Sequence, residues 1–200
     1  ATGDDLVVTS GATANATNIT AFVADNDTTN AGTATLAAVS SGGTIDLTSA
    51  GGSTAYTIVS GSGTDTLKGD DGNDTFTISA AGEGNNDTID GDAHTGGSGD
   101  TIELSPGSHT FSTDNKILNI ETIATHTSGS TVILTGQTEN FTITGNSGAD
   151  IITGGNAVDT VNAGNGNDNI TGGAGNDIIS GGSGNDTFNV NVGTLEPFWA

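Results

Sequence analysis

The chain has 200 residues, of which 24 are Asp or Glu and only 2 are Lys or Arg, giving a formal net charge of −22. This charge argues against nucleic-acid binding, which needs Lys and Arg for phosphate contacts, and against binding to an anionic membrane surface. The absence of Cys excludes disulfides and thiolate metal sites, and no apolar run approaches the roughly 18 residues that span a bilayer. Because the chain begins with Ala1 and contains no Met, we expect it to be a segment of a larger protein.

Residues 1–59 form a first region that is rich in Thr, Ala, Ser and Gly. Its apolar residues fall in short runs typical of strands, namely 6–9, 18–24, 34–40, 44–48 and 55–60. We expect a β region here. It is either the start of a solenoid or a small separate β-sandwich, and the residues leave both open.

Residues 60–104 carry an irregular nine-residue pattern. SGSGTDTLK (60–68) and GDDGNDTFT (69–77) each place an Asp two residues before an apolar side chain, and looser copies at 81–90 and 96–104 keep that spacing. The candidate metal-binding residues of this block are Asp65, Asp74, Gly63, Gly72, Asp87 and Asp100.

Residues 105–144 contain strand-like runs without Asp-rich turns, at 109–112, 116–126, 131–136 and 140–145. Ile123, Ile133, Ile143 and Ile152 are spaced ten, ten and nine residues apart, which predicts that the strand register of the last block extends back into this region. We therefore expect metal-free rungs of the same solenoid here. No segment of the chain shows a convincing helical period.

Residues 145–189 repeat most regularly. Five consecutive units, GNSGADIIT, GGNAVDTVN, AGNGNDNIT, GGAGNDIIS and GGSGNDTFN, follow without insertion. Position six is always Asp, and position eight is always apolar: Ile152, Val161, Ile170, Ile179 and Phe188. High charge with few aromatics is typical of disorder, but a strict repeat of this period is typical of a solenoid.

Each unit divides into a six-residue turn and a three-residue strand. Gly accepts positive φ in the turn without steric cost, and the strand places one apolar side chain inward. If two units make one turn of the solenoid, Ile152, Ile170 and Phe188 lie in one sheet and Val161 and Ile179 in the other. Asp carboxylates then stack at about 4.8 Å, and a pair repels by roughly 3 kcal/mol at an effective dielectric of about 20. Bare Asp rows would destabilise such a solenoid.

The pattern G-G-x-G-x-D-x-U-x on 145–189 and 60–77 resembles the RTX (repeats-in-toxin, or haemolysin-type calcium-binding) family. The resemblance implies an all-β fold, a right-handed parallel β-roll or β-helix solenoid with Ca²⁺ bound in its Gly/Asp turns. Carboxylates and backbone carbonyls are the oxygen ligands that Ca²⁺ prefers. Because the unfolded chain has no preformed site, Ca²⁺ binding would contribute to folding.

The resemblance also implies that each ion lies between turns n and n+2. Five units then give three sites, which pair 145–150 with 163–168, 154–159 with 172–177, and 163–168 with 181–186; Ala157 and Val158 make the second the least regular. The candidate ligands of this block are the carboxylates Asp150, Asp159, Asp168, Asp177 and Asp186 and the turn residues Asn146, Gly148, Gly155, Gly164, Gly166, Gly173, Gly175, Gly182 and Gly184.

No catalytic motif is present: H-E-x-x-H, G-x-S-x-G and a Walker loop are all missing. We expect His94, His109 and His126, which lie in three different segments, to be solvated or in turns. Glu103 and Glu121 are expected to face outward from strands. The residues therefore predict that the chain is not an enzyme.

Two functions fit these features. The first is a calcium-binding structural solenoid of a secreted or cell-surface bacterial protein, because the Thr/Ala/Ser/Gly-rich composition resembles surface-layer proteins and adhesins. The second is an accessory RTX domain of a type I secreted enzyme or toxin. Ca²⁺ is the expected partner; copies of the chain or other cell-surface components are left open. Residues 190–200, with Trp199, are expected to form a C-terminal cap or tail.

Overall fold

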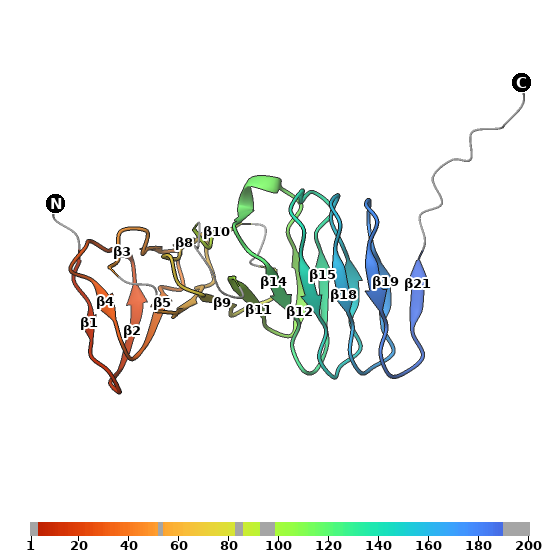
Figure 1. The fold of residues 1–200 in the computed structure, drawn as a ribbon, viewed down its shortest axis with the longest axis horizontal. Helices are drawn as coiled ribbons and strands as arrows, with labels where there is room; N and C mark the ends of the chain where they lie inside the picture. Colours follow the sequence, from red (N-terminus) through yellow and green to blue (C-terminus); the bar gives the residue numbers. More distant parts are fainter. Residues whose placement is uncertain (1–3, 52–53, 83–85, 93–98, 190–200) are drawn as a thin grey trace, which may run out of the picture.

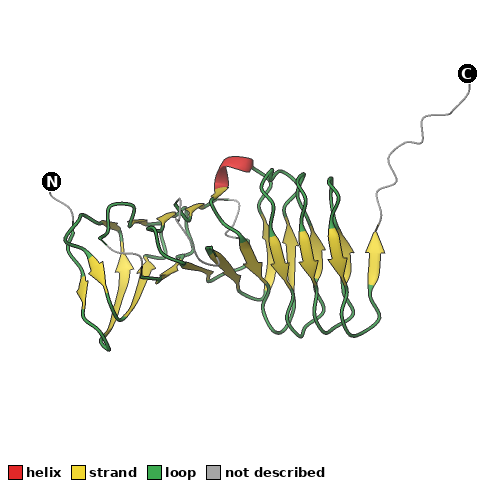
Figure 2. Cartoon of the chain, in the orientation of Figure 1, coloured by secondary structure: helices red, strands yellow, loops and turns green. Residues whose placement is uncertain are grey.

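The computed structural model describes residues 4–51, 54–82, 86–92 and 99–189. These residues wind into a parallel β-solenoid of about eight turns, in which sequence order runs along the long axis from β1 at one end to β21 at the other (Figure 1). Strands and loops make up almost all of it, with a single turn of 3-10 helix, η2 (Asp114–Lys116), among the described residues (Figure 2). The all-β solenoid predicted from the sequence is confirmed.

One sheet, the common sheet, runs the whole length of the molecule. All its neighbouring strands are parallel. Its nine strands, in spatial order, are β2 (Thr13–Ile19), β5 (Thr33–Ala38), β7 (Tyr56–Val59), β9 (Thr75–Ile78), β11 (Thr101–Leu104), β14 (Thr122–Ala124), β16 (Thr142–Thr144), β18 (Thr160–Asn162) and β20 (Ile178–Ser180).

Two five-stranded sheets complete the rungs. The first opposing sheet contains β3 (Ala21–Val23), β6 (Thr44–Asp46), β8 (Thr66–Lys68), β10 (Thr88–Asp90) and β13 (Ile117–Leu118). The second opposing sheet contains β12 (Gly107–Thr110), β15 (Ser130–Ile133), β17 (Ile151–Thr153), β19 (Asn169–Thr171) and β21 (Thr187–Asn189). A two-stranded sheet of β1 (Val7–Val8) and β4 (Thr29–Asn30) lies at the N-terminal end.

The change from one opposing sheet to the other takes place in a single three-sided rung. Here the chain passes from β11 in the common sheet to β12, then to β13, and returns to the common sheet at β14. β12 is therefore the first strand of the second opposing sheet, and β13 is the last of the first. The sequence pattern did not predict this rung.

The core is a single apolar seam inside the solenoid, built from the inward residue of each strand. In the common sheet the aligned residues Leu36, Ile58, Phe76, Ile102, Ile123, Ile143 and Val161 are all buried. Burying one such side chain contributes about 1.5–3 kcal/mol. Stacking these small contributions over many rungs stabilises strands that are too short to be stable alone.

Apart from β1 and β4, the strands of residues 1–59 belong to the common sheet and the first opposing sheet. β2, β5 and β7 are consecutive parallel strands of the common sheet, and β7 pairs with β9, so this region begins the solenoid and is not a separate sandwich.

In residues 105–144, the strand register expected from the sequence is wrong by one residue at β15. Val132, not Ile133, pairs with Ile152 and is buried. The predicted cap or tail at 190–200 lies outside the described residues.

Candidate metal sites

Asp side chains form hydrogen-bonded rows, here called aspartate ladders, at the corners of the solenoid. Each Asp precedes a strand, and its Oδ1 accepts the backbone N–H of the residue one rung earlier. Beside the second opposing sheet, Asp150 accepts from Ser130 N (2.7 Å), Asp168 from Asp150 N (2.8 Å) and Asp186 from Asp168 N (3.1 Å). The position-six Asp of the repeat thus joins successive rungs.

The ladder beside the common sheet is longer. Asp74 accepts from Tyr56 N (2.7 Å), and Asp100 accepts from Asp74 N (2.6 Å). Asp100 N donates to Glu121 Oε2 at 2.7 Å, so Glu121 continues the ladder and the expectation that it faces outward is wrong. The next rung has Phe141, which cannot accept, and the ladder resumes where Phe141 N donates to Asp159 Oδ1 (2.9 Å).

Three further ladder contacts complete the set. Asp177 Oδ1 accepts from Asp159 N at 3.0 Å beside the common sheet. Beside the first opposing sheet, Asp65 Oδ1 accepts from Gly43 N (2.6 Å) and Asp87 Oδ1 accepts from Asp65 N (2.9 Å). Every Asp predicted as a metal ligand therefore lies in one of three ladders.

The second carboxylate oxygen tests whether a cation fits these corners. Asp65 Oδ2 and Asp159 Oδ2 accept N–H groups of their own turns, from Gly61 and Gly155, both at 2.8 Å. Asp168 Oδ2 is buried and has no hydrogen-bond partner. A buried carboxylate oxygen without a partner is costly, and a hard cation such as Ca²⁺ would satisfy it. The donor set of the regular block therefore fits Ca²⁺.

The turns of the last three units share one backbone conformation. Positions two and four have positive φ in each, at Gly164, Gly166, Gly173, Gly175, Gly182 and Gly184. A Cβ on these glycines would meet a carbonyl oxygen of the turn one rung earlier. Gly is therefore required twice over, for its φ and for the close stacking of turn backbones.

Turns two units apart stack as predicted. Asn165 N donates to Asn146 O (2.9 Å), Ala174 N to Gly155 O (3.0 Å) and Ser183 N to Gly164 O (2.8 Å). The turns 145–150 and 154–159 contain no residue with positive φ. Of the three predicted pairs of turns, only 163–168 with 181–186 joins two turns of the shared conformation. The sequence predicted that the second pair would be the least regular, but the first pair also contains one turn without positive φ.

Burial of the ladder carboxylates disfavours their charged form. It raises the pKa of Asp150 and Asp159, and it raises the pKa of Asp74 and of Asp100 to about 7. The two cationic side chains of the protein lie elsewhere: Lys68 Nζ is 3.5 Å from Asp46 Oδ2, and Lys116 Nζ donates to Asn86 O at 3.2 Å. A bound divalent cation would supply the missing positive charge.

The irregular block has its candidate residues at two corners. Asp65 and Gly63 lie in the turn before β8, and Asp74 and Gly72 in the turn before β9. Asp87 and Asp100 precede β10 and β11 on the next rung.

Two acidic features were not predicted. Asp70 is buried beside Asp74; it occupies position two of its unit, where the pattern has Gly. Asp5, Asp25 and Asp27 bring carboxylate oxygens within 4.8 Å of one another near the N-terminal end, where Asp5 and Asp27 are exposed. Because Asp5 lies in a different loop from Asp25 and Asp27, no motif in the sequence identifies the three together.

The histidines differ from one another. His109, expected in a turn or in solvent, is fully buried in β12, where its Nε2 lies 2.9 Å from Ser105 O and burial lowers its pKa. His126 fits the expectation, since it lies between β14 and β15 with its Nδ1 2.8 Å from Ser128 Oγ. His94 lies outside the described residues.

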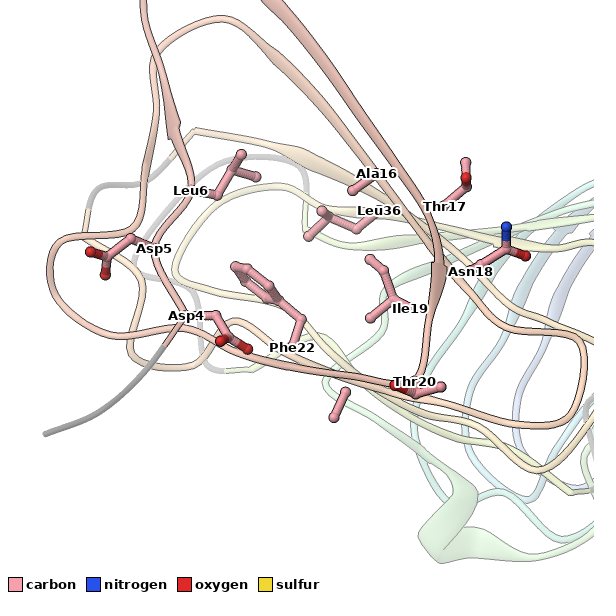
Figure 3. A pocket seen from close by; sticks show the side chains of 11 residues that line it. Asp4, Asp5, Leu6, Ala16, Thr17, Asn18, Ile19, Thr20, Phe22 and Leu36 are labelled. Atoms are coloured by element: carbon pink, nitrogen blue, oxygen red, sulfur yellow. The ribbon is translucent and has the colours of Figure 1, made fainter.

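A hollow of about 520 Å³ opens at the N-terminal end of the solenoid. Figure 3 shows Phe22, Ile19 and Leu36 gathered in it, with Asp4 and Asp5 at its side. Its apolar residues Leu36, Ile19 and Phe22 belong to the N-terminal end of the apolar seam.

Comparison with known proteins supports a calcium-binding interpretation of the ladders. Residues 51–77, 135–169 and 153–188 match the family model of the RTX calcium-binding nonapeptide repeat (4 copies). These segments cover less than half of the chain and contain residues 145–188 of the regular block and the first two units of the irregular one. Neither the curated proteins nor the solved structures gave a match. Among the described residues, no helix is long and apolar enough to cross a membrane.

Proposed function

We propose that this chain is a calcium-binding structural solenoid of a secreted or cell-surface bacterial protein, of the surface-layer or adhesin type, and that it folds when it meets external Ca²⁺. Its task is mechanical: it forms a rod whose last rungs are rigid only with metal bound. It is not an enzyme in this proposal. Ca²⁺ is its ligand, held by the Asp carboxylates and turn carbonyls of stacked repeats.

The observation that carries the proposal is the set of buried ladder carboxylates in the regular block. Asp150, Asp159 and Asp168 are each at most 1% exposed, and the protein has only two Lys and no Arg to neutralise them. Uncompensated buried carboxylates oppose folding. Low cytosolic Ca²⁺ would leave them so, whereas millimolar extracellular Ca²⁺ would neutralise them and favour the folded state by mass action.

The Thr-rich surface supports a structural role outside the cell. The common sheet presents Thr57, Thr75, Thr101, Thr122, Thr142 and Thr160 in register on successive strands. These outward side chains are polar and uncharged, and they are typical of β-strands.

The alternative function is an accessory domain of a type I secreted enzyme or toxin. The gene region upstream of Ala1 distinguishes the two functions: Thr-rich β repeats there would favour the structural solenoid, and a catalytic domain would favour the accessory domain.

Far-UV circular dichroism during a Ca²⁺ titration from EDTA tests the folding role, with Mg²⁺ as the control ion. We expect a Ca²⁺-specific gain of β signal. Asp168→Asn should weaken the response, because Asn keeps an acceptor for Asp150 N–H but removes the charge. Asp114→Asn is the matched control, since Asp114 is exposed and lies outside the ladders. An identical, fully folded spectrum in EDTA and in Ca²⁺ would contradict the proposal.

A further inference from the structure

The chain contains one Asn–Gly dipeptide, Asn165–Gly166, at positions three and four of the middle unit of the regular block. An Asn that precedes Gly is especially prone to deamidation, because no Cβ hinders the approach of the glycine nitrogen to the Asn side chain. Asn165 is exposed, so water reaches it. Asn156 occupies the same position in the preceding unit, but it precedes Ala157 and lacks this open approach.

The nitrogen that would react is engaged by the next turn along the solenoid. Gly166 N donates to Ser183 O at 2.8 Å, and Asn165 forms a parallel β-bridge with Ser183. Ser183 belongs to the final rung, defined here as the turn 181–186 together with β21. The Gly166 N–H is therefore occupied only while the final rung is stacked on the turn 163–168.

The final rung is the least buried part of the regular block. Among the described residues, β21 lies at the edge of its sheet and pairs with β19 alone (Figure 1). All three residues of β21 are exposed, and Phe188 is 50% exposed, whereas Ile170 of β19 is fully buried. A segment with few buried apolar contacts opens at a lower free-energy cost than the rest of a structure. Opening of the final rung would release the Gly166 N–H while the inner rungs stay paired.

We propose that Asn165–Gly166 is a deamidation site controlled by the final rung, which protects it when stacked and exposes it when open. In the reaction, Gly166 N loses its proton and attacks Asn165 Cγ. The new C–N bond closes a succinimide, and the side-chain nitrogen takes up the proton and leaves as ammonia. Water then opens the succinimide at one of its two carbonyls. Opening at the side-chain carbonyl gives aspartate, and opening at the backbone carbonyl gives isoaspartate.

Both products impair the turn. Aspartate at position 165 adds a negative charge to a turn that already carries Asp168 in a ladder. Isoaspartate inserts an additional carbon atom into the main chain, and the stacked backbones leave no room for it, since even a Cβ on Gly166 would collide with Gly148 O. A modified chain cannot re-form the same stack. The site therefore marks permanently those molecules whose final rung has stayed open.

The endoproteinase Asp-N, which cleaves before Asp, allows the site and its internal control to be measured in one digest. Residues 159–167 form the peptide with Asn165, and residues 150–158 form the peptide with Asn156. After incubation of the folded protein in mildly alkaline buffer, fragmentation mass spectrometry measures the loss of each side-chain amide. We expect Asn165 to react at least about tenfold more slowly in saturating Ca²⁺ than in EDTA, because bound Ca²⁺ lowers the population of the open rung. Asn156 should stay intact in both.

A variant can open the final rung without removal of calcium. In Gly184→Ala, the added methyl group would collide with Gly166 O, and the loss of the Asn165 amide in saturating Ca²⁺ should become at least about tenfold faster. Gly11→Ala is the matched control, because Gly11 also has positive φ but has nothing within 4 Å of a Cβ. It should leave the rate within about twofold, since the two sites are far apart. Circular dichroism in Ca²⁺ checks that the rest of each variant is folded.

Only the calcium comparison rests on the proposed function, so the outcomes separate the two. Faster reaction in Gly184→Ala, together with equal rates of the parent protein in EDTA and Ca²⁺, would support control by the final rung and contradict calcium-dependent folding. Equal rates at Asn165 in Gly184→Ala and Gly11→Ala would overturn the inference, whatever the effect of calcium. Loss of the Asn156 amide as fast as that of Asn165 in the parent protein would also overturn it.

Discussion

The rungs of residues 33–78 and those of 145–189 have the same parallel arrangement but different stabilising interactions. In the first region, strands such as β9 bury two side chains each, Phe76 and Ile78, both fully. In the second, each strand offers one inward side chain; of the last two, Ile179 is only partly buried and Phe188 is 50% exposed. An apolar core therefore stabilises the first region, and we expect the regular block to depend more on the metal sites proposed for its turns.

The difference shows that regularity of sequence and stability of the bare chain are separate properties. The most regular units have the smallest apolar contribution, because six of every nine residues form the turn. The irregular rungs, which repeat at 18 to 26 residues in the common sheet, spend more residues on strands. We expect the two regions to respond oppositely to metal removal and to core mutation.

Calcium removal should give the largest effect. In EDTA, the amides of β17, β19 and β21 should exchange with deuterium at least about a hundredfold faster than in saturating Ca²⁺, because the ligand stabilises only the folded state. The amides of β5, β7 and β9 should change far less. Hydrogen exchange followed by mass spectrometry measures both regions in one sample. Equal protection of the two regions in EDTA would show that the comparison is mistaken.

The same residue can be truncated in both regions. Phe76→Ala removes a fully buried ring and should lower the free energy of unfolding by about 3–5 kcal/mol. Phe188→Ala removes a half-exposed ring and should cost less than about 1 kcal/mol. Chemical denaturation in saturating Ca²⁺ gives both values. A larger loss for Phe188 would mean that the last rung has a core that the structure does not show.

Glycines distinguish the stacked turns of the regular block from an open turn near the N-terminal end. Gly173 has φ +104° and stacks against Gly155 O, whereas Gly11 has φ +77° with nothing near a Cβ. Gly11→Ala should cost about 1 kcal/mol for its backbone conformation alone, and Gly173→Ala about 3 kcal/mol, because the strained φ and the collision add. Thermal unfolding in Ca²⁺ compares them. Similar losses would show that the close stacking of turns has no energetic weight.

The smallest expected effect is that of pH on the calcium-free protein. Burial raises the pKa of Asp74 and of Asp100 to about 7 and that of Asp70 to about 6, from the ordinary value of 3.8. The stability contributed by these protonated carboxyls is present below pH 3.8 and is lost as pH rises through about 7. The melting temperature in EDTA should therefore fall by a few degrees between about pH 5 and about pH 8.

The same pH series in Ca²⁺ is the control. Protons compete with Ca²⁺ for the carboxylates, so the fall should disappear or reverse. A melting temperature in EDTA that rises over this interval would mean that the ladder carboxylates are ionised at low cost in the folded protein, and the argument for metal dependence would lose its basis.

The sequence was sufficient to predict the fold where the nine-residue spacing is strict. That spacing alone places Ile152, Ile170 and Phe188 in one sheet and Val161 and Ile179 in the other, as the structure has them. It was insufficient at TVIL (131–134), where consecutive apolar residues fit either register and only the neighbouring rungs select Val132. The three-sided rung was also unpredictable, because a strand that changes sheet has the same local pattern as one that does not.

The candidate site was predictable to the same extent. Position six identified every ladder Asp of the regular block, since a fixed spacing gives a fixed corner. Glu121 and Asp70 were missed because each departs from the pattern: Glu121 uses a longer side chain to reach Asp100 N, and Asp70 replaces a glycine. Both become visible only when the stacking of rungs is known.

The eighteen-residue register of the final block limits how the gene can change. Ile151, Asn169 and Thr187 occupy equivalent places on successive strands of one sheet, so removing residues 163–180 would join equivalent points of the winding. Removing only nine would transfer everything downstream to the other sheet and exchange Asp186 between ladders. Evolution can therefore lengthen or shorten the solenoid by duplicating or deleting two nine-residue units at a time. Insertion or deletion of a single unit would instead change which sheet each downstream strand joins.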